Sequence, residues 1–237
     1  MTILELTKDA LLALTDVQLE QVIGRLSEAE VVAHGAGVED VRFSGSITAP
    51  DGGVDIRVDV QDTPFVSGFI PRPNTIFQSK KSSMPSGAIA GEMKPHGTLA
   101  IPISQQCENG GAYIIVSLED DCTETMRTAR LQSMTEAVAD HPNNDAIHLD
   151  FYDRFKLHQW LRQHPSIMLW VRNLLGQPLS GWQSYSRWSI VPDGTTDELI
   201  MEPGVSVILP NRQHQRLTLE QAITLSLIHI SEPTRPY

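Results

Sequence analysis

Three polar side chains of different chemical types occur in two short, largely apolar stretches of the sequence. Asp55 lies early in the alternating run 54–60, and Gln78 and Lys80 lie two residues apart in the run 75–80. Such runs predict β-strands, in which residues i and i+2 lie on the same face. If the two strands are neighbours, a carboxylate, an amide and an ammonium group converge on one surface.

These three groups suit the metal-assisted hydrolysis of a phosphodiester. The carboxylate of Asp55 can bind a hard divalent cation through oxygen, and the amide oxygen of Gln78 is a further oxygen ligand. The ammonium group of Lys80 can orient a water molecule or offset the charge that develops on the phosphate.

The spacing D-x22-Q-x-K after a glycine pair resembles the PD-(D/E)XK nuclease superfamily, in the Mrr-like form in which glutamine replaces the usual acidic residue. This resemblance implies a metal-dependent endonuclease in which Asp55 binds Mg²⁺ and Gln78 completes or orients its coordination shell. Lys80 would position the attacking water or stabilise the pentacovalent phosphate. Mn²⁺ is accepted by the same kind of oxygen-rich site, so the sequence does not rank the two ions.

A helical glutamate often completes the metal site of Mrr-like nucleases, and Glu20 matches that position. Apolar residues at three- and four-residue spacing predict helix from Lys8 to about Glu30. The pair Thr15-Asp16 can cap a second helix, on which Glu20 lies. The resemblance thus makes Glu20 a catalytic and metal-binding candidate, whereas without it Glu20 is a surface residue of an amphipathic helix.

Strands alternate with helices along the rest of the chain. The acidic triplet Glu119-Asp120-Asp121 precedes one of these helices, where the helix dipole favours negative charge. The pattern predicts an α/β fold with helices on both faces of a central sheet, and the resemblance implies its restriction-endonuclease-like form with a mixed sheet. The expected elements are strands at 41–48, 112–118 and 146–152, and helices at 86–94, 123–138, 153–164 and 165–175.

The composition is that of a folded protein with an acidic surface. The chain has 237 residues, 41% of them hydrophobic, which is enough for one well-buried core. Its formal net charge of −11 counts against a broad nucleic-acid-coating surface, so DNA contacts must be focal or be supplied by an oligomer or another domain. Lys81 and Lys94, near Lys80, are candidates for phosphate contacts, and both have an equally simple interpretation as solvated lysines.

The sequence shows no recognisable targeting signal, and this, together with its two cysteines, predicts a cytoplasmic protein with no membrane partner. No run reaches the ~18 apolar residues of a membrane-spanning helix, and the N-terminus lacks the pattern of a signal peptide. Cys107 and Cys122 fit neither a metal-ligand spacing nor a disulfide framework, which favours a reducing compartment.

Two further stretches narrow the resemblance. Tyr152-Asp153-Arg154 with W-L-R-Q-H-P, and then L-W-V-R-N-L-L-G-Q-P-L-S-G-W-Q-S-Y, are similar to the N-terminal nuclease module of bacterial antiviral STAND NTPases. In that family the nuclease is fused to a P-loop ATPase and a repeat sensor, and sensing of a viral protein drives assembly and DNA cleavage. The resemblance covers roughly Leu19 to Pro210 and implies a double-stranded DNA substrate and a homo-oligomer formed through the NTPase region.

The sequence divides into three expected parts. Residues 1–175 are the nuclease domain, and residues 176–224 are an aromatic and glycine-rich linker followed by the start of a missing NTPase region. No G-x-x-x-x-G-K-[ST] loop occurs in the sequence, so the resemblance implies the front part of a longer protein. Residues 225–237 resemble a translated sequencing-adapter read-through, so we leave them out of the predicted fold. The alternative is that they are a genuine short C-terminal segment.

Three functions from different classes are compatible with these patterns. The first is the metal-dependent DNA endonuclease effector, using Asp55, Gln78 and Lys80 with Glu20. The second is a catalytically silent nuclease fold for nucleic-acid binding or assembly, which Gln78 and the acidic composition leave open. The third is an unrelated α/β enzyme in which the D-G-G-V-D turn serves another ligand, and side chains of Asp55 and Lys80 that point apart would favour it.

Overall fold

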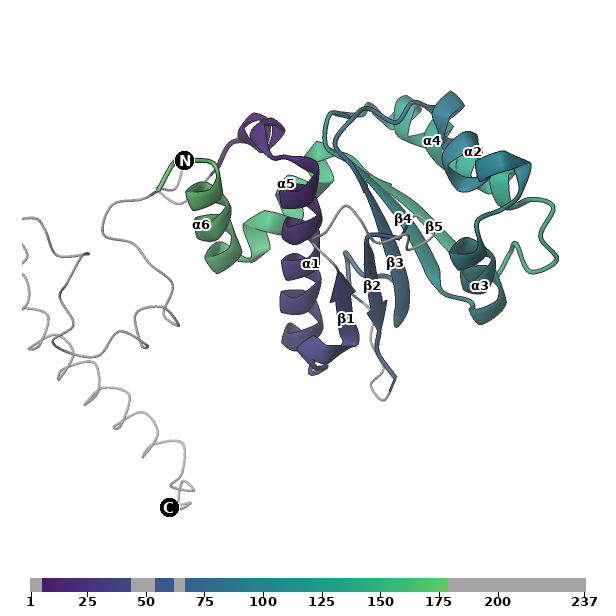
Figure 1. The fold of residues 1–237 in the computed structure, drawn as a ribbon, viewed down its shortest axis with the longest axis horizontal. Coiled ribbons are helices and arrows are strands. Elements are labelled where there is room, and N and C mark those ends of the chain that lie inside the picture. The colour runs from purple at the N-terminus through teal and green to yellow at the C-terminus, as the bar shows by residue number, and fades with distance from the viewer. Residues whose placement is uncertain (1–5, 44–53, 62–66, 179–237) are drawn as a thin grey trace, which may run out of the picture. The chain divides into compact units, whose positions relative to one another are not determined.

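The structure, a computed structural model, describes residues 6–43, 54–61 and 67–178. These residues form a five-stranded sheet with the strand order β1-β2-β3-β4-β5 (Figure 1). The β1–β2 and β2–β3 pairs are antiparallel, and the β3–β4 and β4–β5 pairs are parallel, so the sheet is mixed as expected. The strands are β1 (Val41–Phe43), β2 (Ile56–Asp59), β3 (Asn74–Lys80), β4 (Ala112–Ser117) and β5 (His148–Tyr152).

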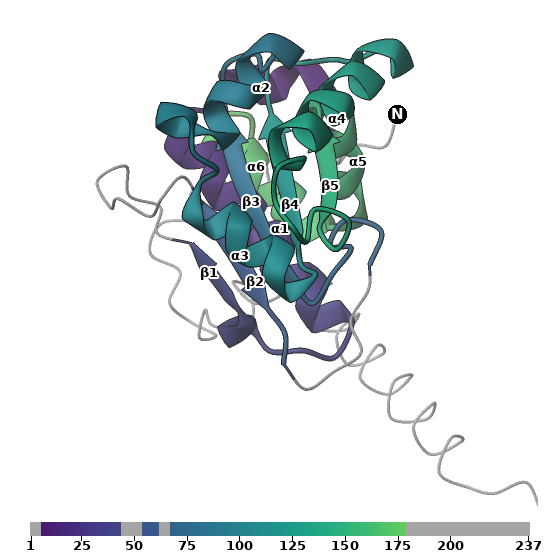
Figure 2. The ribbon, with the colours of Figure 1, turned by 90° about the vertical axis from the view of Figure 1, so that its right-hand side faces the viewer.

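Helices cover both faces of this sheet. One face is covered by α1 (Asp16–Ala33), α5 (Arg154–Gln163) and α6 (Pro165–Leu174). The other is covered by α2 (Ser86–Met93), α3 (Ile101–Asn109) and α4 (Glu124–Val138), which lie in front of the strands in Figure 2. Short 3-10 helices are η1 (Lys8–Ala13), η2 (Val38–Asp40) and η3 (Pro95–Gly97). The predicted α/β class with helices on both faces is confirmed.

The face under α1, α5 and α6 is built around Trp160 of α5, which is fully buried. Its ring stacks on Phe69 with centroids 5.3 Å apart and lies 5.7 Å from the ring of Phe77 on β3. Tyr152 of β5 meets it edge-on at 6.5 Å. Stacked and edge-to-face aromatic pairs contribute about 0.5–1.5 kcal/mol each beyond the area that they bury.

The opposite face is mostly aliphatic and holds α2 against the sheet. Ile89 and Met93 of α2 are buried in one cluster with Ile76 of β3 and Tyr113 of β4. Side chains of β3 therefore alternate between the two layers, with Phe77 on the Trp160 side and Ile76 on the α2 side. Residues that follow Ile76 at two-residue spacing continue on the α2 side.

A local signal accounts for the start of α1. The Thr15 hydroxyl accepts from the backbone N–H of Gln18, and the Gln18 side chain accepts from the N–H of Thr15, which is a capping box at the start of α1. The predicted break between η1 and α1 is thereby confirmed. Ser86 begins α2 at the predicted position, with Pro85 as the cap residue and no side-chain cap on this helix.

The described residues belong to one compact unit, Met1–Ser184. Its last helix ends at Leu174, next to the end expected for the nuclease domain. Most of the expected linker and all of the tail at 225–237 lie outside the described residues. A search of the described helices finds none with the length and apolar character needed to cross a membrane.

Candidate functional site

β2 and β3 place Asp55 beside the last residues of β3. The strands pair with Ile56 opposite Phe77, and the backbone N–H of Asp55 donates to the carbonyl of Phe77 at 3.1 Å. The Asp55 carboxylate accepts from the backbone N–H of Ser79 at 2.6 Å and from its hydroxyl at 2.8 Å. The prediction that the Asp55 and Gln78 strands are neighbours is confirmed, and Asp55 is held on the residue between Gln78 and Lys80.

Gln78 is buried, with 4% of its surface exposed, and both ends of its amide are engaged. The Tyr113 hydroxyl donates to Gln78 Oε1, and Gln78 Nε2 donates to Glu92 Oε1. A carboxylate only accepts hydrogen bonds, so the NH₂ end of the amide must face Glu92 and the oxygen must face Tyr113. Gln78 therefore links a buried tyrosine of β4 to a carboxylate of α2.

Lys80 meets the same carboxylate. Its Nζ lies 2.7 Å from Glu92 Oε1, and the two side chains are 29% and 26% exposed. The prediction that Gln78 and Lys80 share one face is confirmed, because both contact one oxygen of Glu92.

Glu92 was not predicted as a site residue. A signal for it exists in the spacing of α2, because Glu92 lies between Ile89 and Met93, the buried residues that hold the helix on the sheet. A glutamate next to the buried stripe of a helix reaches the sheet with its side chain. What the sequence lacks is any indication of which strand residues it meets.

The pKa of the buried Tyr113 hydroxyl is affected by the carboxylates around this end of β3. Burial raises the pKa of its hydroxyl far above the ordinary value, and the negative charges of Glu92 and Asp55 raise it further. The hydroxyl therefore stays protonated at neutral pH and keeps its hydrogen bond to Gln78. Because both carboxylates act on this hydroxyl, Asp55 and Glu92 lie around the same end of β3.

Glu20 lies on α1, which packs against β1, β2 and β3. With 7% of its surface exposed it is buried, so its alternative interpretation as a surface glutamate is wrong. The apolar residues of α1 join the cluster that contains Phe77, whereas Gln78 and Lys80 reach α2 on the opposite face. The metal-binding role of Glu20 stays a prediction.

The two candidate phosphate-binding lysines lie next to this site in the chain. Lys94 directly follows α2, and its Nζ is 3.1 Å from Asp140. The Asp140 side chain is 92% exposed, and such surface pairs contribute only about 0–1 kcal/mol, so Lys94 can exchange this partner for a phosphate. Lys81 is half-buried and continues the pairing of β3 with β4, its carbonyl accepting from the N–H of Glu119 at 3.0 Å.

Compared with known proteins, the chain matches no protein-family model, no curated protein and no solved structure. The function proposed below therefore rests on the geometry of these residues and on the resemblance of their spacing to the PD-(D/E)XK nucleases.

The donors around the end of β3 suit a hard divalent cation. They are oxygens, from the carboxylates of Asp55 and Glu92, the hydroxyl of Ser79 and the amide of Gln78. Across the part of the chain that the structure describes, no three His, Cys, Asp or Glu side chains form a group able to hold a metal. Mg²⁺ does not need such a cage, because it keeps several waters and binds through one or two carboxylates together with substrate phosphate. The donor set thus fits Mg²⁺ or Mn²⁺.

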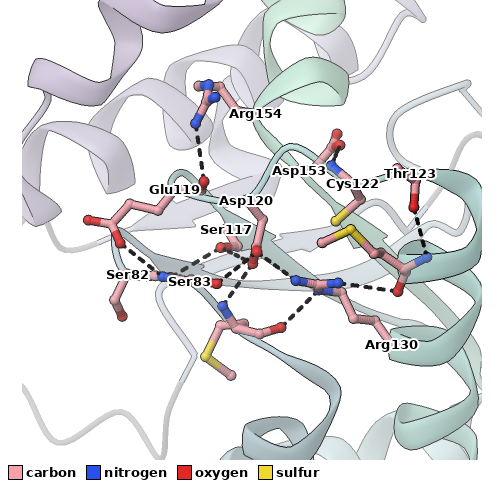
Figure 3. A network of polar contacts seen from close by, with 12 residues as sticks. Ser82, Ser83, Ser117, Glu119, Asp120, Cys122, Thr123, Arg130, Asp153 and Arg154 are labelled. Atoms are coloured by element: carbon pink, nitrogen blue, oxygen red, sulfur yellow. Dashed lines mark hydrogen bonds and ion pairs between the residues drawn. The ribbon is translucent and has the colours of Figure 1, made fainter.

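A buried ion pair fixes the segment that leads into α2 (Figure 3). Asp120 and Arg130 are each 4% exposed, and their side chains meet at 2.6 Å. Asp120 also accepts from the Ser117 hydroxyl at 2.7 Å, the Met84 N–H at 2.8 Å and the Ser83 hydroxyl at 2.8 Å. Arg130 Nε donates to the carbonyl of Met84 at 2.9 Å. The network ties the residues before α2 to β4 and α4, and so holds the helix that carries Glu92.

The charge of Asp120 is stabilised by these contacts. Burial by itself would raise the pKa of its carboxyl, but the hydrogen bonds from Met84, Ser117 and Ser83 and the charge of Arg130 together lower it. Asp120 is thus ionised at neutral pH and has a structural partner for each oxygen. The interpretation of the acidic triplet as charges that complement the dipole of the following helix does not account for this buried residue.

Proposed function

We propose that this chain is a metal-dependent endonuclease module that hydrolyses phosphodiester bonds of double-stranded DNA. The observation that supports the proposal is that Gln78 and Lys80 share the Glu92 carboxylate, while Asp55 binds Ser79, the residue between them. Asp55 binds Ser79, the residue between Gln78 and Lys80, and its charge acts with that of Glu92 on the Tyr113 hydroxyl, so all three side chains lie around the same end of β3. That proximity favours a nuclease over an unrelated α/β enzyme.

Each residue has a chemical role in this proposal. Asp55 holds the cation, Gln78 orients the coordination shell, and Lys80 places positive charge where the attacked phosphate becomes more negative. Mg²⁺ or Mn²⁺, when bound, polarises the phosphate and lowers the pKa of a bound water. Glu20 is a further proposed ligand from α1, and Lys81 and Lys94 position the DNA backbone without reading its sequence.

The module would act in the cytoplasm as the effector of an antiviral STAND NTPase, active once the chain assembles. Two features support this context. The motif stretches around Tyr152 and after Leu169 resemble that family's nuclease module. The net charge of −11 disfavours strong DNA binding by one isolated copy, and assembly would place several focal lysine sites on one duplex.

One observation favours a catalytically silent binding or assembly module instead. Glu92 already engages both the ammonium group of Lys80 and the amide of Gln78, so the chain supplies partners for the groups that would act on a substrate. In a silent module these contacts would be permanent. Cleavage activity separates the two functions.

The test is cleavage of supercoiled plasmid by the full 237-residue chain with Mg²⁺, alone and fused to a tetramerising domain. Asp55→Ala and Lys80→Ala should each lower the rate by about 100-fold or more, as removal of a transition-state-stabilising group does in other enzymes. Matched controls are Asp59→Ala, an exposed aspartate of β2, and Lys8→Ala, a lysine paired with Asp121 at the surface. Both controls should cleave at the rate of the unchanged chain.

Each other outcome has a definite meaning. Activity only in the tetrameric fusion supports activation by assembly. Equal cleavage by the unchanged chain, Asp55→Ala and Lys80→Ala would show that the activity comes from another site or a contaminant. Absence of cleavage in both formats would favour the silent module.

A further inference from the structure

The Gln78 position leaves the proposed site one carboxylate short. In the motif that the spacing resembles, this position usually carries an acidic residue, and here it carries an amide. The Gln78 oxygen accepts from the buried Tyr113 hydroxyl, and its NH₂ group faces Glu92. An amide engaged at both ends and 4% exposed is better placed to hold a neighbour than to present its oxygen to a cation.

Glu92 has the properties of a ligand that Gln78 lacks. Its carboxylate pairs with the ammonium group of Lys80, and its side chain is 26% exposed and thus reachable from solvent. Gln78 and Lys80 both contact Oε1, and within the described ranges no side chain or backbone group donates to Oε2. One oxygen is therefore used to orient the group and the other is available.

The helix under Glu92 is held firmly at both ends. Before α2, the N–H and the carbonyl of Met84 are bound by Asp120 and Arg130. At its other end, Met93 is fully buried in the cluster under α2. Glu92 is thus presented by a fixed element, which is what a ligand needs to hold its geometry.

We infer that Glu92 of α2 supplies the acidic ligand that position 78 lacks, binding the divalent cation together with Asp55, and that Gln78 is the residue that positions it. This inference rests on the proposed function, because it concerns the same cation. It assigns direct cation contact to Glu92 and removes that contact from Gln78.

The test measures Mn²⁺ binding to the full chain by isothermal titration calorimetry, without DNA and independently of activity. Glu92→Gln keeps the size of the side chain and removes its charge, and it should weaken Mn²⁺ binding by at least about 10-fold, comparable to Asp55→Ala. The matched control is Glu108→Gln, an exposed glutamate on the neighbouring helix α3, which should bind Mn²⁺ as the unchanged chain does.

An exchange variant adds a rescue. Gln78→Glu combined with Glu92→Gln keeps one acid and one amide in contact and moves the charge back to the strand. It should recover Mn²⁺ binding to within about threefold of the unchanged chain, a gain that a purely structural role of Glu92 does not predict. Gln78→Glu alone places two carboxylates in contact and should lower the unfolding temperature.

The outcomes separate this inference from the proposed function. If Asp55→Ala weakens Mn²⁺ binding and Glu92→Gln leaves it within twofold, Glu92 is no ligand and the nuclease proposal stands. If the unchanged chain binds no Mn²⁺, or binds it as Asp55→Ala does, the metal site itself is refuted. Thermal unfolding is recorded for every variant, and if Glu92→Gln alone fails to fold, failure of the folded exchange variant to bind Mn²⁺ overturns the inference.

Discussion

Three residues after β4, the carboxylate of Asp120 is almost fully enclosed by its hydrogen-bond donors. Its pKa is lowered below the ordinary value of 3.8, because these donors and Arg130 outweigh the effect of burial. A carboxyl whose pKa is lower in the folded than in the unfolded state stabilises the fold at pH values above its unfolded pKa. This contribution is lost as the pH falls through the folded value.

Asp120→Asn should therefore destabilise the protein strongly at pH 7. The change removes the charge that faces Arg130 and leaves a buried cation uncompensated, which typically costs about 3–5 kcal/mol of unfolding free energy. Urea denaturation measures this. The matched control is Asp140→Asn, whose side chain is 92% exposed and pairs with Lys94, and it should cost less than about 1 kcal/mol.

The same role of Asp120 predicts how the stability difference between the unchanged chain and Asp120→Asn changes with pH. The stability difference between the unchanged chain and Asp120→Asn should be full above pH 5 and should narrow as the pH falls below about 4. A difference that is as large in acid as at neutral pH, or equal costs for the two Asn variants, would contradict the role given to Asp120.

Residues that depend on a distant partner could not be predicted from the sequence. Asp55, Gln78 and Lys80 carry a signal in their strand spacing, and the structure brings them together. Glu92 and Asp120 acquire their roles only when α2 is laid on β3 and when the end of β4 meets α4. Neither of these two contacts leaves a signal in the hydrophobic periodicity or in the capping residues of the sequence.

Among the elements, the helices that carry a cap in their sequence were predicted well. Thr15, Thr123 and Asp153 each accept a hydrogen bond from the first turn of the following helix, and each is visible from residue type alone. α3 was missed because only Ile103 and Cys107 mark its apolar side, too few for a recognisable period. Its other signals, a proline in the first turn and Gly110 in the left-handed conformation at the end, are also typical of loops.

Alanine substitutions of a glycine in α2 and of a glycine in the turn before β4 should have opposite effects on stability. Gly91 lies on the exposed side of α2, and a Cβ there would meet no atom within 4 Å. A Cβ on Gly111 would lie 2.6 Å from the backbone carbonyl oxygen of Asn74, which cannot move without disturbing β3. Gly91→Ala should therefore stabilise the protein by about 0.5–1 kcal/mol, and Gly111→Ala should destabilise it by about 1–3 kcal/mol.

Urea midpoints of the two variants give the comparison directly. Destabilisation by Gly91→Ala would show that the exposed side of α2 is packed in solution. A neutral effect of Gly111→Ala would show that β3 and the turn before β4 can separate at little cost.

For the whole molecule, the acidic charge makes the salt dependence of DNA binding informative. Each phosphate neutralised by a lysine contributes about −0.9 to the slope of log K against log salt concentration. Lys80, Lys81 and Lys94 together should therefore give the Asp55→Ala chain a slope of about −2.7 on a labelled duplex. Fluorescence anisotropy between 50 and 200 mM salt covers the range in which such contacts weaken.

Variants of single lysines show how much each lysine contributes to this salt-dependence slope. Lys81→Ala and Lys94→Ala, each combined with Asp55→Ala, should make the slope less steep by about 0.9. Lys8→Ala, which removes a surface lysine of η1 that pairs with Asp121, should leave the slope unchanged. A slope that is the same in every variant would place DNA on another surface.

The sequence predicted the layered architecture, a sheet covered by helices, because the hydrophobic periodicity of the strands and helices determines the α/β fold class. Helices cover both faces of the sheet as expected. The distribution of helices between the faces was not predictable, since α2, α3 and α4 share one layer only through contacts between distant residues. The site depends on that distribution, because it brings α2 over Gln78 and Lys80.

The alternation of β3 has a consequence for insertions and deletions. Phe77 belongs to the aromatic layer around Trp160, whereas Gln78 and Lys80 contact Glu92 on the other side. Packing and the proposed chemistry thus use neighbouring positions of one strand, Phe77 for the first and Gln78 and Lys80 for the second. An insertion or deletion of one residue within the strand exchanges the two sets at once. A change of length in this stretch is therefore expected to cost more than a point substitution at any one of its positions.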